Sequence, residues 1–572
     1  MRLSLSKSKN ATSLYVIEDI IENNKRTSKV VKKLGTVKEL EKKLKGRDPI
    51  EWAKEYVAKL NRLEEKGKEP IVIAKYSPSK LVNKDERRSF NGGYLFLQNI
   101  YYKLGLDRIC NEISKKYKFE YSLDSILSRL LYGRILFPSS KLSTYELSSE
   151  LLEPPGFELH QIYRALEVIA KETDFIQSSL YQNSLSFSKR NTGILYYDCT
   201  NYFFEIEQGE GLKQYGFSKD HKPNPVVQMG LFMDGDGIPL AFSITEGNKN
   251  EQLTLKPLEE KILSDFKLSR FVVCTDAGLA SKSNRIFNNK ADRAFITTQS
   301  IKRLKSFLKK WALDPEGWYL ASSTKTYDIR ELDEEVHRDN IFYKERWIKE
   351  DGLEQKLIVT YSIKYRDYHN KVRVSQIERA LKALDTNPSN IKKYRQNDYK
   401  RFIVRKTCTD DGEIAKNEVY SLNTDLIDSE AAYDGFYAVC TNLEDDGAEI
   451  AQINRRRWEI EECFRILKGE FKARPVYLKR DDRIAAHFTT CFIALVIYRI
   501  LEKKLKEQFT CNTIVKALRK MNFKELKKEG YIPTYTRTEF TDILHETFGF
   551  RTDYEIVTLK QMKKIFRQTK KR

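Results

Sequence analysis

Hydrophobic and polar positions follow first a strand periodicity and then a helical periodicity along the N-terminal part of the chain. Residues 14–34 alternate as the strands of a β-hairpin would, with a turn around Asn23 and Asn24, and apolar residues then recur at helical spacing from Glu51 to Glu65. Helical spacing dominates the next stretch, where several amphipathic stripes follow one another. We therefore predict a basic hairpin-and-helix module at 1–85 and a helical region at 86–190.

The pattern changes to strands after Gly193. The stretch ILYYDCTNYFFE is aromatic and strand-like, and VVQMGLFMD and IPLAFSIT flank a Gly-Asp-Gly turn, as the two arms of an antiparallel hairpin do. A helix from about Leu253 to Leu263 and a buried strand from Phe271 to Thr275 come next. This order of elements predicts an α/β core whose first part spans 191–300.

A mostly β segment interrupts this core at 301–434. The core resumes with the strand GFYAVCTN and a long helix from Glu449 to about Lys472, which predict a second core segment at 435–505. The apolar run FTTCFIALVIY within it is too short for a membrane span, so we expect a buried helix and no membrane association. The remaining residues, 506–572, are basic and are expected to be helical.

Charge is unevenly distributed along the chain. Lys and Arg number 102 against 81 Asp and Glu, a formal net charge of +21, and most of the excess lies in 1–85 and 503–572. Basic modules at both ends of a nearly neutral middle favour a polyanionic partner, with nucleic acid first. The eight scattered cysteines include no C-x-x-C pair, which argues against a structural zinc site. The start MRLSLSKSKN has no apolar export segment, so we expect a cytoplasmic protein.

Two aspartates are placed where a metal site can form. Asp198 ends the apolar stretch ILYYD, and Asp276 ends FVVCTD before a loop of small residues. A carboxylate at the exit of a buried strand is held rigidly, and neighbouring strand ends can bring two of them together. Because two bare carboxylates repel each other, one must take up a proton or a cation must lie between them. Magnesium is the hard cation that suits oxygen ligands of this kind.

A third acid, Glu461, lies on the predicted long helix. At about 100° per residue, Asn454, Arg457, Glu461 and Lys468 form a polar stripe that borders the core-facing apolar stripe. An acid flanked by two bases suits a site where a carboxylate binds metal and cations bind phosphates. The same pattern also fits ion pairs on an ordinary helix surface. The neighbouring Trp458 is expected to be a packing residue.

These motifs together resemble bacterial insertion-sequence transposases of the IS-four-like DDE group. The segment NRRRWEIEECFRILK matches the family signature Y-x2-R-x3-E-x6-K at Arg457, Glu461 and Lys468, with Asn454 in place of the usual tyrosine. YYDCTNYFFE resembles the family's first-aspartate strand, and VCTDAGLAS resembles its second-aspartate block. GFSKDHKPNPVVQMGLFMDGDGIPLAFSITEGNKNE, which contains Lys219, resembles the segment between them. The motifs occur in the family's order.

The resemblance implies a cut-and-paste DNA transposase of the α/β class, with an RNase H-like (ribonuclease H-like) catalytic core, a β-rich insertion, and N-terminal and helical DNA-binding regions. It implies that Asp198, Asp276 and Glu461 hold two Mg²⁺ ions, for which Mn²⁺ can substitute, and catalyse cleavage at transposon ends and strand transfer into target DNA. The implied partners are double-stranded DNA, as terminal inverted repeats and target, and a second copy of the chain in a synaptic homodimer. The residues implied to contact DNA are Asn454, Arg457, Lys468 and Lys219.

Two alternatives stay open on the sequence alone. A catalytically inactive transposase relic could keep the fold and bind DNA without cutting it, and another RNase H-like DNA endonuclease could share the carboxylates. The complete carboxylate set argues against a relic. The long insertion and the R-x3-E-x6-K helix favour a transposase over an endonuclease. In each case we expect the protein in the bacterial cytoplasm, at the nucleoid.

Overall fold

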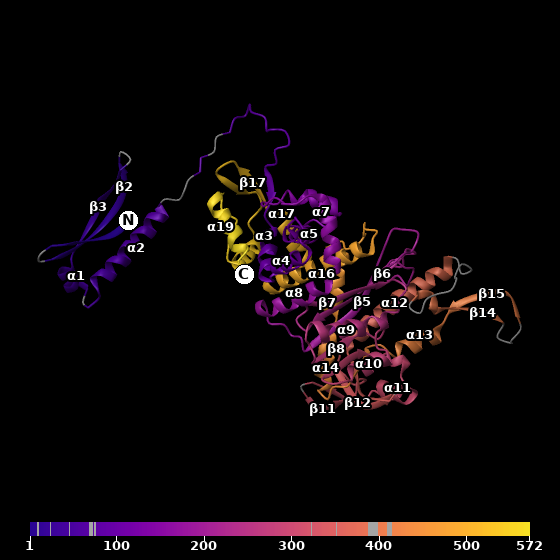
Figure 1. Cartoon of the computed structure of the whole chain (residues 1–572). Coiled ribbons are helices and arrows are strands. Elements are labelled where there is room, and N and C mark those ends of the chain that lie inside the picture. Colours follow the sequence, from indigo (N-terminus) through magenta and orange to yellow (C-terminus); the bar gives the residue numbers. More distant parts are fainter. Residues whose placement is uncertain are drawn as a thin grey trace. The chain divides into compact units, whose positions relative to one another are not determined.

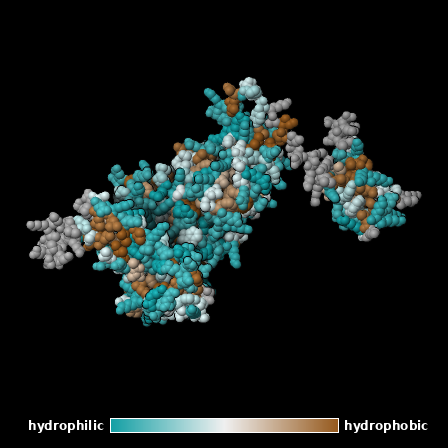
Figure 2. All heavy atoms as spheres, turned by 180° about the vertical axis from the view of Figure 1, so that it is seen from behind, coloured by the Kyte–Doolittle hydropathy of each residue, from teal (hydrophilic) through white to brown (hydrophobic). Residues whose placement is uncertain are grey.

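A ten-stranded mixed sheet and a group of helices make up most of the larger of two units in this computed structural model (Figure 1). The units are Met1–Glu86 and Arg87–Arg572. The structure describes residues 1–8, 11–22, 25–44, 46–67, 72–73, 76–321, 323–350, 352–386, 398–408 and 414–571. On the face seen in Figure 2, hydrophilic residues cover most of the larger unit and hydrophobic residues form smaller patches. That face therefore offers mainly polar side chains.

The smaller unit is a three-stranded antiparallel sheet with two helices. Its strands β1 (Arg2–Lys7), β2 (Thr12–Glu22) and β3 (Lys25–Thr36) are hydrogen-bonded in that order, and α1 (Val37–Leu44) and α2 (Pro49–Gly67) follow. Leu14, Leu40 and Ala53 form its buried core. The predicted hairpin and helix are confirmed, and Asn23 and Asn24 of the predicted turn lie outside the described residues. The first strand was missed because its six residues are too few for their alternation to stand out.

Five strands at one end of the large sheet carry the predicted motifs. In the order β7-β6-β5-β8-β9, the first three pair antiparallel, whereas β5, β8 and β9 run parallel. The predicted sequence of strand, hairpin, helix and strand is therefore confirmed. The bounds are β5 (Ile194–Phe203), β6 (Val226–Asp234), β7 (Pro239–Glu246), α9 (Leu255–Asp265), β8 (Phe271–Thr275), α10 (Lys282–Asn288) and β9 (Arg293–Thr298).

Strands from the predicted insertion extend the same sheet. β16 pairs antiparallel with β9 on one side and β13 on the other, and β12, β10 and β11 continue outward, whereas β14 and β15 pair only with each other among the described strands. The prediction of a mostly β segment was incomplete, because the segment also contains helices. The longest of them, α12, was missed because it buries only Ile363 and Ala380 and therefore has no apolar stripe in its sequence. The bounds are α11 (Ser306–Leu313), β10 (Trp318–Leu320), β11 (Ser323–Tyr327), β12 (Phe342–Glu350), β13 (Leu353–Tyr361), α12 (Ile363–Thr386), β14 (Ile403–Cys408), β15 (Ile414–Leu422), α13 (Thr424–Ala431) and β16 (Phe436–Thr441).

The helical region packs around one central helix, α16 (Asp481–Lys504), which contacts α3, α5, α7 and strand β7 (Figure 1). By length and composition α16 could cross a membrane, but 94% of its most apolar window is buried inside the protein. The predicted buried helix at FTTCFIALVIY is confirmed. The surrounding helices are α3 (Tyr94–Lys103), α4 (Leu106–Tyr117), α5 (Leu123–Leu136), α6 (Lys141–Ser148), α7 (Leu159–Lys171) and α8 (Thr173–Phe187).

The expectation that residues 506–572 are helical was wrong in part. Three strands from this region form a four-stranded antiparallel sheet with β4, in which Asn522 pairs with Asn91. Local periodicity cannot reveal a pairing between segments so far apart in the sequence. The elements are β4 (Ser89–Asn91), α17 (Cys511–Lys520), β17 (Asn522–Leu526), β18 (Gly530–Pro533), α18 (Glu539–Phe548), β19 (Val557–Thr558) and α19 (Leu559–Thr569).

The predicted long helix from Glu449 to Lys472 is two helices, α14 (Gly447–Arg455) and α15 (Trp458–Lys468). At their junction the Arg456 and Arg457 amides each donate to the carbonyl three residues back, at 3.1 Å, rather than four residues back. This tighter turn changes the angle between residues before and after it. The predicted polar stripe therefore runs across two helices, and Asn454, Arg457 and Glu461 still line one cavity.

Glu259 on α9 gives the fold a pH dependence that can be measured. Its side chain is fully buried and accepts hydrogen bonds from Asn288 Nδ2 at 2.9 and 3.1 Å. Burial raises its pKa from 4.5 to about 7, although Asn288 and Arg293 oppose the shift. Because the folded-state pKa is raised, the contribution of this group to stability is complete below its unfolded pKa and is lost as the pH rises through 7.

Replacing Glu259 with glutamine removes the ionisable group and keeps the shape of the side chain. We expect Glu259→Gln to gain about 2–3 kcal/mol of stability relative to the wild type between about pH 4.5 and pH 8. Urea unfolding of both proteins at the two pH values measures this difference. A stability difference that does not change with pH would show that the buried carboxyl keeps an ordinary pKa.

Candidate active site

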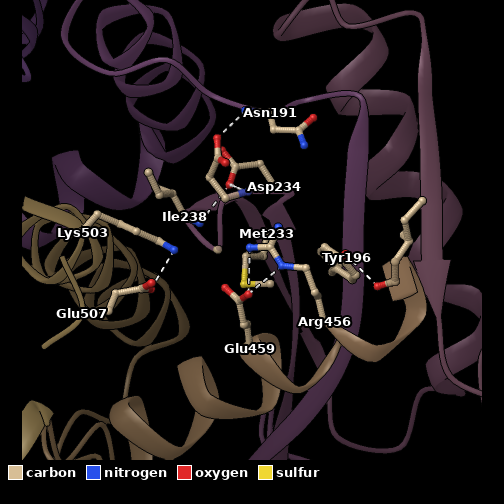
Figure 3. A network of polar contacts seen from close by, with 12 residues as sticks. Asn191, Tyr196, Met233, Asp234, Ile238, Arg456, Glu459, Lys503 and Glu507 are labelled. Carbon is tan, nitrogen blue, oxygen red and sulfur yellow. Dashed lines mark hydrogen bonds and ion pairs between the residues drawn. The ribbon is translucent and has the colours of Figure 1, made fainter. Parts of the chain in front are cut away.

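Asp198 lies in β5, on the sheet face turned toward α14. Side chains alternate along a strand, so Tyr196 and Asp198 share one face whereas Tyr197 and Cys199 share the other. The Tyr196 hydroxyl donates to the Ile453 carbonyl at 2.9 Å, which fixes that face against α14 (Figure 3). Asp198 was predicted at the end of its strand and lies instead within it. It follows the point where pairing with β8 stops while pairing with β6 continues, so the strand has an open edge there.

Asp276 directly follows β8 and lies level with Asp198. The parallel register pairs Tyr196 with Cys274, each aspartate follows two residues later, and the Asp276 carboxylate is near enough to raise the pKa of Asp198. Backbone amides hold both carboxylates. The amide of the next residue donates to Asp198 Oδ1 at 2.7 Å, and the Leu279 amide donates to Asp276 Oδ1 at 3.0 Å. The structure thus brings together the two aspartates that were predicted from sequence.

The pKa of Asp198 is raised by burial and by the neighbouring carboxylate. Burial raises the pKa of its carboxyl from 3.8 to about 6, and the Asp276 carboxylate adds to the shift. The positive charges of Lys219 and Arg457 act in the opposite direction. Two carboxylates in this arrangement are stabilised by a shared proton or by a cation between them.

Arg457 lies within electrostatic reach of all three predicted carboxylates. Burial lowers the pKa of its guanidinium, but the Tyr437 hydroxyl and the carboxylates of Asp198, Glu461 and Asp276 raise it on balance. Its Nη2 atom is 3.5 Å from Glu461 Oε1, and 60% of the Glu461 side chain is exposed. The negative charges of three carboxylates, from separate parts of the fold, therefore act on Arg457.

The three carboxylates suit a divalent metal by their chemistry. Among the described residues, no three His, Cys, Asp or Glu side chains already form a cluster that could hold a metal ion. Asp198 and Asp276 are nonetheless oxygen donors on adjacent strands whose mutual repulsion a cation would relieve. Glu461 acts on the same arginine from α15. Carboxylate oxygens of this kind are the ligands that Mg²⁺ prefers.

Lys219, Lys468 and Arg474 form a cationic cluster beside the carboxylates. Lys468 Nζ and Arg474 Nη1 lie 3.6 and 3.1 Å from Asp220 Oδ2, and Lys219 Nζ lies 3.4 Å from Glu251 Oε1. Burial opposes protonation of Lys219, but the nearby carboxylates raise its pKa on balance. Burial lowers the pKa of Lys468, and the positive charges of its two neighbours in the cluster add to this effect. In the structure the positive charges of the cluster are balanced by Asp220 and Glu251.

Three residues of this arrangement were not predicted from sequence. Asp220 and Glu251 lie in the segment that carries the family resemblance, but their spacing does not distinguish them from other acids. Arg474 lies in the loop after α15, whose course periodicity does not predict. A search for basic residues just after the R-x3-E-x6-K helix would have found it.

Asn454, Arg457 and Glu461 of the predicted stripe line one cavity, together with Trp458. Asn454 is 5% exposed, and its Nδ2 donates to the Tyr437 hydroxyl at 3.0 Å, so its amide faces the protein interior. Trp458 was expected to pack and is 61% exposed. With Tyr437 it lines a cavity of about 280 Å³ beside Glu461.

A buried ionic network holds α15 against α16 and the turn between β6 and β7. Glu459 accepts hydrogen bonds from Arg456 at 3.0 and 2.9 Å (Figure 3) and pairs with Arg499 at 3.3 Å. Arg499 also donates to the Gly237 carbonyl at 2.8 Å and pairs with Glu502. Gly237 has a φ of +79°, and a Cβ there would lie 2.1 Å from Glu459 Oε2, so a larger residue would displace the network. These contacts fix the helix that carries the third carboxylate.

A known protein family matches the segment that carries most of this site. The family model described as Transposase DDE domain matches residues 203–497, which is more than half of the chain. The match includes Asp276 and Glu461 and begins just after Asp198. No curated protein matches the chain. Among solved structures, the chain is similar to the cryo-EM structure of the piggyBac transposase synaptic complex with hairpin DNA, with 7% sequence identity and a TM-score of 0.35 over 75% of this chain and 78% of that one.

Proposed function

The chain belongs to the transposase DDE domain family and is a DNA transposase, and we propose that Asp198, Asp276 and Glu461 are its catalytic carboxylates. The observation that carries this assignment is their convergence on Arg457 from three separate elements. The parallel register of β5 and β8, in which each aspartate follows two residues after a paired position, supports it independently.

We also propose that the core is RNase H-like and that the chain falls in the IS-four-like group. The strand order β7-β6-β5-β8-β9, with an antiparallel meander followed by two parallel strands, supports the first part. The R-x3-E-x6-K spacing of Arg457, Glu461 and Lys468 supports the second. In this arrangement Asp198 lies in β5, Asp276 directly follows the adjacent strand β8, and the third carboxylate comes from a helix packed on β5.

The proposed metal is Mg²⁺, as two ions, with Mn²⁺ as a substitute. When bound, such ions supply Lewis-acid stabilisation of the charge that develops on a phosphodiester during displacement. Asp198 and Asp276 each accept a backbone N–H, so their oxygens are oriented before a ligand arrives. Glu461 is more exposed and contributes its carboxylate from α15.

The cationic side chains of the site are proposed to position the DNA strand. Lys219, Lys468 and Arg474 gather beside the carboxylates, and Arg457 lies among them, so phosphate oxygens can accept charge-assisted hydrogen bonds there. Such contacts set the position of a strand without reading its sequence. Asn454 lines one cavity with Arg457 and Glu461 and is proposed to join these contacts, while its amide also donates to the Tyr437 hydroxyl.

The proposed substrates are the terminal inverted repeats of a transposon and a target DNA duplex. The basic segments 1–85 and 503–572, with net charges of +9 and +10, support a role in binding these ends. Joining two ends in one reaction calls for two copies of the chain, so a synaptic homodimer is part of the proposal. We place the reaction in the bacterial cytoplasm, at the nucleoid.

Full-length protein and duplex DNA carrying the ends of its own element test this proposal. We expect nicking at the ends and joining of the freed 3′ ends to target DNA, and both should require Mg²⁺ and stop with EDTA. Cleavage without joining would indicate another RNase H-like endonuclease. Tight binding without cutting in Mg²⁺ or Mn²⁺ would indicate an inactive DNA-binding relic.

A further inference from the structure

A cleft of about 600 Å³ opens between the start of α6 and the loop that follows α15. Arg474 links this cleft to the candidate active site, because it also pairs with Asp220, the acid that Lys468 contacts. The lining contains several basic and hydroxyl side chains, and none of its residues is acidic within the part of the chain that the structure describes. The basic and serine residues of the lining are Arg134, Ser139, Ser140, Lys141, Ser143, Lys472 and Arg474.

Lys141 is the residue of the cleft whose charged group most clearly lacks a partner. It is the first residue of α6, lines the cleft, and has only 6% of its surface exposed. Among the described residues, no oxygen accepts a hydrogen bond from its Nζ and no carboxylate lies within ion-pair distance. A buried ammonium is normally paired, because burial of an isolated charge is costly.

Other unpaired donors surround the same space. Arg134 Nε and Ser139 Oγ are buried and have no hydrogen-bond partner among the described atoms. The Arg134 guanidinium is held in place, since its Nη1 donates to two carbonyls of the loop after α15 at 3.1 and 3.2 Å. Ser140 Oγ caps α6 by accepting from the Ser143 amide at 3.1 Å. A helix start of this kind attracts negative charge.

The charged and titratable groups around Lys141 add no negative charge at neutral pH. Burial and the Arg134 charge lower the pKa of Lys141 from 10.5 to about 7. Burial also lowers the pKa of His487, with Arg134 and Lys141 adding to the effect. Burial raises the pKa of the nearby Cys491 thiol. An anion in the cleft would therefore be the group that keeps Lys141 protonated near neutral pH.

We propose that this cleft binds a backbone phosphate of the DNA substrate, held by Lys141, Arg134 and the start of α6. The inference rests on the proposed function, because a strand that contacts Lys468 and Arg474 would continue past Lys472 into the cleft. A phosphate fixed here, away from the carboxylates, sets the register of the strand relative to the site of cutting.

Lys141→Met tests the site in the DNA-free protein, because it replaces the ammonium with an apolar chain. In phosphate-free buffer the variant should have an unchanged or higher Tm, since an unpaired buried charge has been removed. Inorganic phosphate at matched ionic strength should raise the Tm of the wild type and not that of the variant.

Lys344→Met is the matched control. Lys344 is 4% exposed, and burial lowers its pKa to about 8, but its Nζ donates to the Asp314 carbonyl at 2.8 Å and lies 4.5 Å from the Trp318 ring centre. This variant should therefore have a lower Tm than the wild type and keep the phosphate response.

A second measurement follows the affinity of the same proteins for duplex ends as a function of salt. Lys141→Met should weaken binding roughly tenfold and lower the slope of log K against log salt by about 1, for every DNA sequence tested. A wild-type phosphate response and salt slope in this variant would overturn the proposal. Loss of the phosphate response with an unchanged slope would also overturn it, because the anion site would then not serve DNA. If the predicted slopes are seen but the wild type never cuts, the cleft assignment stands and the proposed activity fails.

Discussion

Replacing Glu461 with glutamine is expected to slow Mg²⁺-dependent cleavage of transposon ends by at least about a thousandfold. The substitution keeps the size of the side chain but removes its negative charge and one oxygen donor. Because 60% of the Glu461 side chain is exposed, we expect the variant to fold and to bind the ends as the wild type does. Single-turnover cleavage and a separate DNA-binding titration measure the two effects.

Glu462 provides the matched control for this prediction. It is the next residue on α15, and it accepts a hydrogen bond from Arg465 Nε at 2.7 Å rather than pairing with Arg457. Glu462→Gln should leave the cleavage rate within about twofold of the wild type, because its carboxylate faces Arg465 and not the proposed metal site. Equal effects of the two substitutions would remove Glu461 from the catalytic set.

Replacing Arg499 with leucine is expected to cost about 3–5 kcal/mol of folding stability. The Arg499 side chain is 4% exposed and neutralises two acids, Glu459 and Glu502, whose side chains are 9% and 11% exposed. Leucine would leave Glu502 buried without a counter-charge, would leave Glu459 with Arg456 as its partner, and would remove the donor to the Gly237 carbonyl. Urea unfolding at neutral pH measures the loss, and cleavage should also slow because the network fixes α15.

Arg465→Leu is the comparison for this second prediction. Arg465 lies on α15 and pairs with Glu462, but its side chain is 76% exposed. Its replacement should change stability by less than about 1 kcal/mol. A similarly small loss for Arg499→Leu would mean that the buried acids find other partners and that the network does not anchor α15.

Local sequence patterns predicted the elements that position Asp198 and Asp276. The apolar runs around both residues, and the hairpin with its Gly-Asp-Gly turn, depend on neighbours within a few positions, and the structure has all of them. Even so, Asp198 lies within β5, because β6 continues to pair beyond the point where β8 stops. Which partner strand ends first is a property of the assembled sheet.

Other features depend on contacts that no local pattern contains. Asn454 and Glu461 were assigned to one helix, whereas three-residue hydrogen bonds divide it into α14 and α15, although both side chains still line one cavity. Arg474 joins the site through Asp220, which lies in the loop between β5 and β6, far from Arg474 in the sequence. Lys141 belongs to the helical region and was not singled out, because a buried lysine cannot be distinguished from an exposed one by sequence alone. Each of these positions is set by packing between distant segments.

The account depends most on direct metal binding by the strand aspartates, and the rate of end cleavage by Asp276→Cys in Mg²⁺ and in Mn²⁺ tests this most directly. A thiolate is a poor ligand for Mg²⁺ and a better one for softer transition metals. We predict no measurable cleavage by this variant in Mg²⁺ and partial recovery in Mn²⁺. The same rate in both metals, whether zero or equal to that of the wild type, would contradict the claim that Asp276 binds the metal that cuts DNA.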